Sequence, residues 1–232
     1  YNTAANGPAA RVWATYLGGH GPDYPESMVV NNQGELLLLG TSGSSDYPTT
    51  PGAYDRSFNL GTSIDPYQYG AGYLINGGTD IVVTRFNASG SALLGSTYLG
   101  GSGNEGVLDP DGPASPLVHN YGDPFRGDII VDAADNVYLA SNTSSSNFPA
   151  SGSFQPTYRL NSDAVVCKLS PDLSTLLWSS FLGGSGADAA YSLQLGPSGA
   201  VYVCGGTSSP NFPTPGGTLV PAAPGGLADG FV

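Results

Sequence analysis

A six-residue phrase that recurs three times constrains the fold of this chain more than any other feature. Variants of STYLGG occupy residues 14–19, 96–101 and 179–184. The first glycines of the three copies, Gly18, Gly100 and Gly183, stand 82 and then 83 residues apart. Self-similarity at a fixed period is typical of proteins built from repeated structural units. The chain is therefore expected to stack copies of one unit.

The segments between the copies are typical of β-hairpins. The first kind of segment is an apolar run, a turn rich in Asn, Asp or Gly, a second apolar run, and a Ser/Thr-rich bend that an aromatic residue and proline close. It occupies residues 26–48, 127–149 and 191–213. A second strand, turn and strand ends in the next copy of the phrase, at 79–101 and 162–184, with a shorter counterpart at 228–232. Each full unit thus predicts four strands.

The repeat divides one continuous domain into three units, 1–101, 102–184 and the truncated 185–232. The spacing of equivalent residues places an insertion near 60–78 in the first unit and another near 104–124 in the second. Four short antiparallel strands per unit with glycine-rich links are typical of β-propeller blades. We predict an all-β, propeller-like array of four-stranded antiparallel blades, about three repeats with the last one incomplete. A sandwich or solenoid of the same hairpins is the alternative.

Three longer phrases, STYLGGSG, VYVCGGTSSPNFPT and DAVVCKLSPDLSTLLWSSFLGG, resemble the SBBP β-propeller repeats of large secreted bacterial proteins. The resemblance covers nearly all of the chain apart from residues 1–10 and the two insertions. It implies a propeller and an exported, surface-associated protein, and it implies no defined activity. The insertions and the third unit, which stops inside a strand at Val232, depart from the family pattern. We expect a longer native polypeptide or a neighbouring chain to complete that unit.

Composition excludes some partners. Apolar residues make up 40% of the chain and charged residues 10%, and the formal net charge is −12. Such a charge repels phosphate backbones and anionic lipid surfaces, and no apolar run approaches the roughly eighteen residues of a membrane span. We expect no nucleic-acid partner and no membrane insertion. Cys167 and Cys204 lie in apolar runs and are expected to be buried free thiols, with a mutual disulfide as the alternative.

Motifs that carry enzyme chemistry are scarce. The chain has two histidines, His20 and His119, and neither a zinc-binding HExxH motif nor a GxSxG nucleophile elbow occurs. GSGNEG at 101–106 fits a dinucleotide-binding pattern, but no helical period follows it, so we interpret it as a turn between units. No catalytic residues are predicted. A glycan hydrolase or lyase that works through two carboxylates is the alternative, because 18 acidic residues offer no unique pair.

Two sets of acidic residues recur at equivalent places in the units. The first set begins strands and is expected to accept backbone N–H groups in turns: Asp80, Asp163 and Asp229. The second set follows the glycine phrase and should lie on one rim of the array: Asp23, Glu105 and Asp188. We expect solvated turn residues at this rim. A calcium site is the alternative, because Ca²⁺ prefers oxygen ligands.

The insertions carry the side chains that differ from the repeat. Loops that depart from a repeated scaffold commonly present function. Tyrosine and histidine rings can stack on sugars or pack against a protein partner. The predicted binding residues are Tyr67, Tyr69, Tyr73, His119 and Tyr121. The alternative is that these loops only cap apolar edges of the scaffold.

These patterns favour a non-enzymatic, secreted, cell-surface β-propeller scaffold for adhesion or protein or glycan binding, without a cofactor unless calcium binds the rim. The expected partners are other protein subunits or surface glycans. The first alternative is a subunit of an extracellular filament, completed by strand or blade sharing between neighbouring chains. The second is the glycan hydrolase or lyase.

Overall fold

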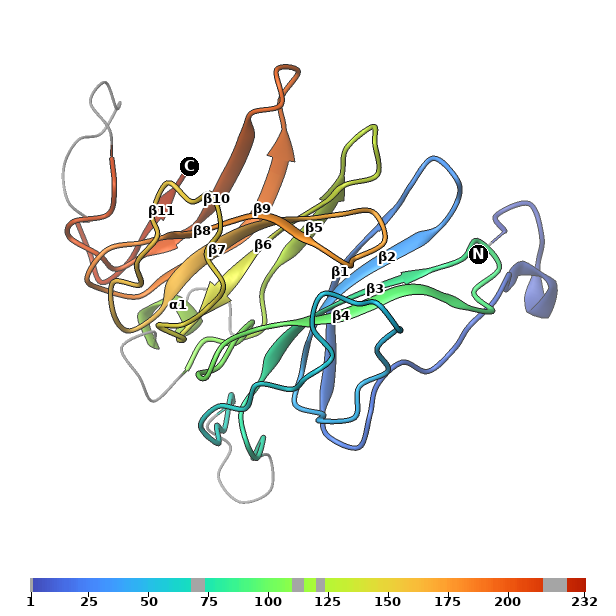
Figure 1. The fold of residues 1–232 in the computed structure, drawn as a ribbon, viewed down its shortest axis with the longest axis horizontal. Helices are drawn as coiled ribbons and strands as arrows, with labels where there is room; N and C mark the ends of the chain where they lie inside the picture. Colours follow the sequence, from blue (N-terminus) through green and yellow to red (C-terminus); the bar gives the residue numbers. More distant parts are fainter. Residues whose placement is uncertain (1, 68–73, 110–114, 120–123, 215–224) are drawn as a thin grey trace.

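The computed structural model describes residues 2–67, 74–109, 115–119, 124–214 and 225–232. The described strands form three antiparallel sheets, called sheets 1, 2 and 3 in chain order (Figure 1). Sheet 1 contains β1 (Asp23–Val30), β2 (Leu36–Ser42), β3 (Asp80–Phe86) and β4 (Leu93–Leu99). Sheet 2 contains β5 (Asp128–Val131), β6 (Val137–Thr143), β7 (Asp163–Leu169) and β8 (Leu176–Leu182). Sheet 3 contains β9 (Asp188–Leu195), β10 (Val201–Thr207) and β11 (Asp229–Phe231).

Two short helices complete the described elements, the 3₁₀ helix η1 (Gly7–Ala10) and the α-helix α1 (Ser115–His119). Within each sheet, strands that follow one another in the chain are hydrogen-bonded neighbours. The prediction of an all-β array of antiparallel sheets is confirmed, with four strands in sheets 1 and 2 and three in sheet 3. Among the described residues, no helix has the length and apolar character needed to cross a membrane.

The first hairpin of each sheet turns through a short polar loop. In sheet 1, Asn31 Oδ1 accepts the backbone N–H groups of Gln33 and Glu35 at 3.1 and 2.9 Å. Asp132 Oδ1 plays the same part in sheet 2, at 2.9 Å from the N–H groups of both Ala134 and Asn136. A short polar side chain that binds the backbone within its own loop favours a turn over continued strand, which explains why these hairpins were predictable.

The three sheets lie side by side in chain order, with β5 next to both β1 and β9. Asp128 on β5 joins these strands. Its Oδ1 accepts the Ser27 hydroxyl of β1 at 2.7 Å, and its Oδ2 accepts the Ser192 hydroxyl of β9 at 2.7 Å. The three residues occupy equivalent places in the aligned hairpins, where Asp replaces Ser in the second unit. One carboxylate therefore links all three sheets.

Sheet 2 is covered on both faces. One face packs against sheet 1 in an apolar cluster that includes Leu39 and Val83 of sheet 1 and Leu139 and Val165 of sheet 2. The other face packs against sheet 3 through a cluster that includes Ala140 of sheet 2. All seven residues of β6 are buried, whereas burial alternates along the first part of β10. Removing apolar area from water on both faces makes sheet 2 the centre of the array.

The leucine of each glycine phrase packs on the sheet that follows it. Leu17 shares an apolar cluster with Tyr47, Val82 and Tyr98 of the first unit. Leu99 shares one with the equivalent residues of the second unit, Phe148, Val165 and Phe181. Leu182 belongs to the cluster that contains Phe231 of sheet 3. At Leu99 and Leu182 the phrase thus joins one sheet to the next.

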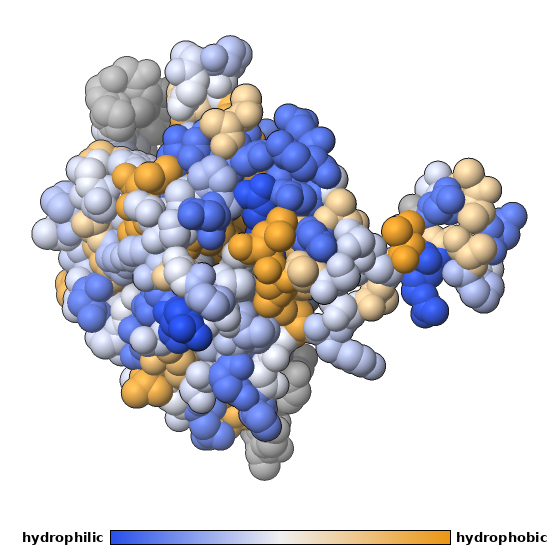
Figure 2. All heavy atoms as spheres, turned by 45° about the vertical axis from the view of Figure 1, so that its right-hand side comes forward, coloured by the Kyte–Doolittle hydropathy of each residue, from blue (hydrophilic) through white to orange (hydrophobic). Residues whose placement is uncertain are grey.

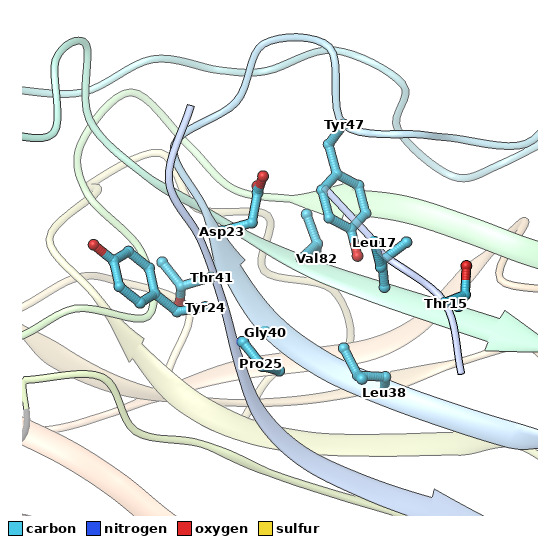
Figure 3. A pocket seen from close by; sticks show the side chains of 10 residues that line it. All are labelled: Thr15, Leu17, Asp23, Tyr24, Pro25, Leu38, Gly40, Thr41, Tyr47 and Val82. Atoms are coloured by element: carbon cyan, nitrogen blue, oxygen red, sulfur yellow. The ribbon is translucent and has the colours of Figure 1, made fainter. Parts of the chain in front are cut away.

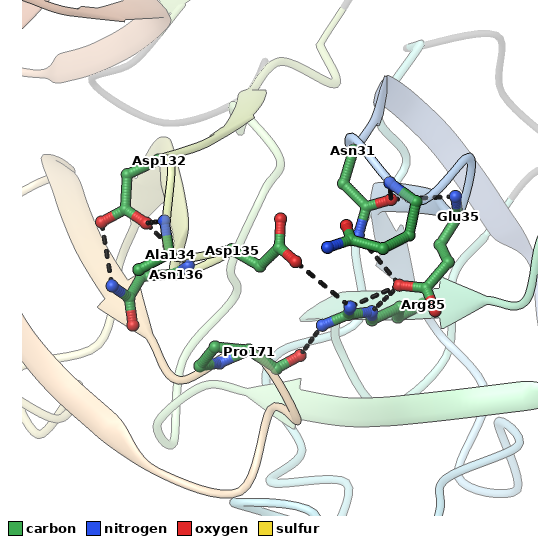
Figure 4. Close-up of polar contacts among 9 residues, drawn as sticks. Asn31, Glu35, Arg85, Asp132, Ala134, Asp135, Asn136 and Pro171 are labelled. Atoms are coloured by element: carbon green, nitrogen blue, oxygen red, sulfur yellow. Dashed lines mark hydrogen bonds and ion pairs between the residues drawn. The ribbon is translucent and has the colours of Figure 1, made fainter.

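Ionic contacts join sheets 1 and 2 at the far end of β3 (Figure 4). Arg85 Nε donates to Glu35 Oε2 at 2.8 Å, and the same guanidinium lies 3.7 Å from Asp135 Oδ2 in the β5–β6 turn. Arg85 also donates to the carbonyl oxygen of Pro171 in the β7–β8 turn. The side chains of Arg85, Glu35 and Asp135 are 12%, 18% and 15% exposed.

Both cysteines are free, as expected, and Cys167 is buried in the core. The prediction that Cys204 is buried is wrong, because it lies on the exposed part of β10, in the outermost described sheet. No further sheet of the described structure covers that face.

Candidate functional site

The first glycine of the phrase lies against a pair of carboxyl groups at Gly100 and Gly183, and against the single carboxyl group of Asp23 at Gly18. A Cβ atom at Gly100 would collide with Asp80 Oδ1 and lie 2.7 Å from Glu105 Oε2. A Cβ atom at Gly183 would lie 2.5 Å from Asp163 Oδ1 and 2.8 Å from Asp188 Oδ2. Only glycine leaves room for both carboxyl groups. The structure thus brings the two predicted sets of acidic residues together in pairs, Asp80 with Glu105 and Asp163 with Asp188.

Glu105 is fully buried and is held by hydrogen-bond donors from the end of β6, the bend that follows it and Gly101. Its Oε1 accepts the hydroxyls of Thr143, at 2.7 Å, and Ser145. Its Oε2 accepts the N–H of Gly101 at 3.1 Å. These donors replace the water that would otherwise solvate a carboxylate.

The equivalent residues have equivalent donors. Asp188 Oδ2 accepts the Gly184 N–H at 2.7 Å and the Ser209 hydroxyl at 2.6 Å. Asp23 Oδ2 accepts the Gly19 N–H at 2.8 Å and the Ser44 hydroxyl at 2.9 Å. The prediction of solvated turn residues is wrong for Glu105 and Asp188, which are fully buried. The donors of the following Ser/Thr-rich bend explain the difference, because they satisfy the carboxylates without water.

The strand-initial aspartates accept backbone N–H groups, as predicted. Asp80 Oδ2 accepts the N–H of Asn59 at 2.7 Å, Asp163 Oδ2 that of Arg159 at 2.8 Å, and Asp229 Oδ2 that of Gly225 at 2.7 Å. Asp80 and Asp163 are fully buried. The other oxygen of each, Oδ1, is buried without a hydrogen-bond partner and faces the glycine of the phrase.

Burial dominates the electrostatics of the two pairs. Desolvation raises the pKa of Asp80 to about 6 and that of Asp163 to about 7. It also raises the pKa of Glu105 and Asp188, although hydrogen bonds from their hydroxyl donors act in the opposite direction. The loss of solvating water and the nearby second carboxyl group both disfavour the ionised form of each group.

The predicted calcium ligands do not come together. Asp23, Glu105 and Asp188 lie in three separate places, where each accepts the N–H of the second glycine of the phrase before it. Within the part of the chain that the structure describes, no group of three or more His, Cys, Asp or Glu side chains is placed to hold a metal ion.

The two insertions converge in one layer beside β1. Ile64 and Ile75 of the first insertion form a buried cluster with Val107 and Phe125 from the second. The ring of Tyr24 on β1 stacks on Phe125 with the ring centres 3.9 Å apart. Apolar residues within otherwise polar, glycine-rich insertions are the sequence signal for this layer, which we did not predict.

Of the predicted binding residues, Tyr67 lies against this layer. Tyr67 is half-buried and packs edge-on against Phe125, with ring centres 6.1 Å apart. His119 is the last residue of α1. Tyr69, Tyr73 and Tyr121 lie outside the described residues. The described part of both insertions therefore caps apolar edges of the scaffold, as the alternative prediction stated, while the tyrosine predictions at 69, 73 and 121 stay predictions.

The helix α1 was not predicted from the sequence. Its Leu117 is fully buried and belongs to a cluster with Leu108, Ala187 and Ala189, next to the start of β9. Five residues are too few for a helical period to stand out.

A pocket lies on the face of sheet 1 that is turned away from sheet 2, and its lining is mainly apolar (Figure 3). Leu17, Leu38, Tyr47 and Val82 form much of it. The Tyr47 hydroxyl is 3.0 Å from Thr84 Oγ1, and burial raises the pKa of Tyr47. Figure 2 shows a hydrophobic area of the surface beside the place where the N-terminal segment joins the body. Surface of this kind suits packing against another polypeptide better than catalysis.

No protein-family model matches this chain, and no curated protein matches it either. The geometry of the site therefore carries the functional argument alone.

Proposed function

We propose that this chain is part of a β-propeller of the SBBP type, a non-enzymatic scaffold exported to the bacterial cell surface for adhesion through protein or glycan binding. The repeated packing supports this proposal. Each glycine phrase places a leucine on the sheet that follows it. Gly100 and Gly183 also lie in contact with both carboxyl groups of a pair. The repeated residues are used to join sheets, which is how successive propeller blades are related.

The convergence of the two insertions carries the binding part of the proposal. They are separated in the chain by β3 and β4, yet Ile64 and Ile75 share a buried cluster with Val107 and Phe125. Asn104 Nδ2 also donates to Thr62 Oγ1 at 3.2 Å. A repeated scaffold commonly presents function where it departs from the repeat. A joined layer offers a broader contact surface than either loop alone.

The buried carboxyl pairs give no support to the glycan hydrolase alternative. Catalytic carboxylates of a glycosidase flank the scissile bond and must reach the sugar. Asp80, Glu105, Asp163 and Asp188 are all fully buried. They act within the scaffold.

Binding by the insertions is tested with the double variant Tyr69→Ala/Tyr73→Ala. Fluorescently labelled protein is applied to a glycan array and to cells, and its melting temperature is measured in parallel. We expect binding to fall by about tenfold or more, the equivalent of roughly 1.4 kcal/mol, with an unchanged melting temperature. Tyr202→Ala, which changes an exposed tyrosine on β10, is the matched control. Equal binding by the double variant and the wild type would contradict the proposal.

Assembly between chains is the second candidate function, and residues 14–19 favour it. They carry the phrase that ends β4 and β8, but they pair with no strand of the described structure. Leu17 still packs on the outer face of sheet 1, as Leu99 packs on sheet 2. In an assembly, strands of a neighbouring polypeptide would pair with residues 14–19 and form a further sheet with them.

Light scattering over a range of protein concentrations tests the assembly candidate. A filament subunit should form larger particles as the concentration rises, and deletion of residues 228–232, which include the edge strand β11, should reduce their mass. Particles of the same mass before and after the deletion count against strand sharing.

A further inference from the structure

The two carboxyl pairs lie at the borders between sheets. Asp80 begins β3 of sheet 1, whereas Glu105 is bound to Thr143 and Ser145 of the second unit. Asp163 begins β7 of sheet 2, and its partner Asp188 begins β9 of sheet 3. The same arrangement thus occurs at both borders of sheet 2.

The hydrogen-bond donors around the pairs leave three buried carboxyl oxygens without a partner, one in the first pair and two in the second, where Asp188 Oδ1 also lacks one. Glu105 accepts three donors through its two oxygens. Asp80 accepts the Asn59 N–H through Oδ2, while its buried Oδ1 has no partner and faces the same glycine as Glu105 Oε2. The Oδ1 of Asp163 is likewise buried without a partner and faces the same glycine as Asp188 Oδ2. A buried oxygen without a donor is costly, and a carboxyl group that keeps its proton becomes a donor itself.

The charged and titratable groups facing the pairs do not neutralise two negative charges at each. Asp55 and the phenols of Tyr98 and Tyr158 face the Asp80–Glu105 pair. Tyr158 and Arg159 face the Asp163–Asp188 pair. Arg159 is exposed and reaches Asp163 through its backbone N–H, and its charge lowers the pKa of Asp163 by less than burial raises it. Two adjacent carboxyl groups in a dry site cannot both ionise without a compensating cation.

We propose that each pair binds a single proton in mildly acid solution, which is shared between two sheets. In this arrangement Asp80 Oδ1 donates to Glu105 Oε2, and Asp163 Oδ1 donates to Asp188 Oδ2. Each border then carries one negative charge, and Asp80 Oδ1 and Asp163 Oδ1 gain a function as donors. Loss of the proton places two negative charges across the border and loosens it. This inference is independent of the proposed adhesive function.

The direction of the pH effect follows from linkage. A carboxyl group with a raised folded-state pKa stabilises the fold below its unfolded value, and this stabilisation is lost as the pH rises through the folded value. The folded values are about 6 for Asp80 and about 7 for Asp163. The stabilisation from these two groups should therefore be complete below about pH 4 and should fall as the pH rises through about 7.

The double variant Asp80→Asn/Asp163→Asn tests the shared protons. An asparagine amide donates where the protonated carboxyl would, and it keeps an oxygen for the Asn59 or Arg159 N–H. Melting temperatures are measured from pH 5 to 9. We expect the wild type to lose roughly 5 °C or more over this range and the double variant to lose less than half as much. Asp229→Asn, at the equivalent but exposed position, is the matched control and should keep the wild-type profile.

Two further measurements keep the proposal falsifiable if the double variant fails to fold. Infrared spectra of the wild type should show the C=O band of a protonated carboxyl group at pH 5 that disappears by pH 9. EDTA should leave the melting temperature at pH 7 unchanged. The proposal is overturned if the band is absent at pH 5, if EDTA lowers the melting temperature and Ca²⁺ restores it, or if the double variant keeps the wild-type pH profile.

Discussion

The two ends of β3 join sheet 1 to sheet 2 through opposite kinds of electrostatics. At its first residue, Asp80 meets Glu105 in a fully buried pair of like groups. At the other end, the partly exposed Arg85 contacts Glu35 and Asp135, which are groups of opposite charge. The Asp80–Glu105 pair is held by hydroxyl and backbone N–H donors and needs glycine beside it, whereas the contacts at the other end need the Arg85 guanidinium. Alkali should therefore weaken the interface between sheets 1 and 2 at the Asp80 end, and acid should weaken it at the Arg85 end.

The largest expected loss is at the buried end, where a side chain on Gly100 meets both carboxyl groups. Gly100→Val should reduce the free energy of unfolding by about 3 kcal/mol or more, because overpacking and displaced hydrogen bonds add. Urea denaturation measures the loss. Gly225→Val is the matched control, since no heavy atom lies within 4 Å of a Cβ built there. Equal stability of Gly100→Val and the wild type would mean that the close approach at Gly100 is unimportant.

The next largest effect compares one glutamate from each end. In Glu105→Gln, one oxygen that accepts hydroxyl or N–H donors is replaced by an NH₂ group, so at least one buried donor loses its acceptor. We expect a loss of about 2 kcal/mol. Glu35→Gln, which changes a partly exposed partner of Arg85, should lose about 1 kcal/mol or less. Denaturation of both variants at pH 7 checks the order, and the reverse order would contradict the distinction between the two ends.

Removal of the cation tests the ionic end. Arg85→Met should lower the free energy of unfolding at pH 7 by about 1 kcal/mol. Hydrogen bonding to Arg85 lowers the pKa of Glu35 below its ordinary value of 4.5, so this stabilisation is present above pH 4.5 and is lost as the pH falls further.

The gap in melting temperature between the wild type and Arg85→Met should therefore narrow between pH 6 and pH 3. Arg56→Met, which removes an exposed basic side chain that hydrogen-bonds Thr49, is the control for loss of a basic side chain. A gap of constant size at all pH values would show that Arg85 acts through packing alone.

The smallest effect is expected at the exposed tip of the first unit. His20 forms an ion pair with Asp46 there, whereas a serine and an asparagine meet at the equivalent places of the other units. The Asp46 carboxylate raises the pKa of His20, so the charged pair forms at acid pH and is lost as the pH rises through that value. The double variant His20→Ser/Asp46→Asn should keep the wild-type melting temperature at pH 8. A clearly lower melting temperature of the double variant at pH 8 would show that the exposed His20–Asp46 pair contributes to stability and would contradict this prediction.

The sequence predicted the elements of this fold better than the contacts between them. The glycine phrase and the Asn or Asp turns are local signals, so the strands and their antiparallel pairing could be predicted, and so could the N–H groups that Asp80 and Asp163 accept. The pairing of Asp80 with Glu105 was missed because it depends on how neighbouring sheets approach each other. Asp128 was missed for the same reason, although its replacement of serine at a repeated position is a visible signal.

The order of the strands has a consequence for how the chain folds as it is synthesised. In sheets 1 and 2 every strand pairs with its neighbours in sequence, so sheet 1 can form before Thr143 and Ser145, which hold Glu105, have left the ribosome. Until then Asp80 faces water and is ionised at neutral pH. Under proton sharing, docking of each new sheet takes up one proton from the surrounding solution. Each border that forms in mildly acid solution should therefore remove one proton from the solution around the growing protein.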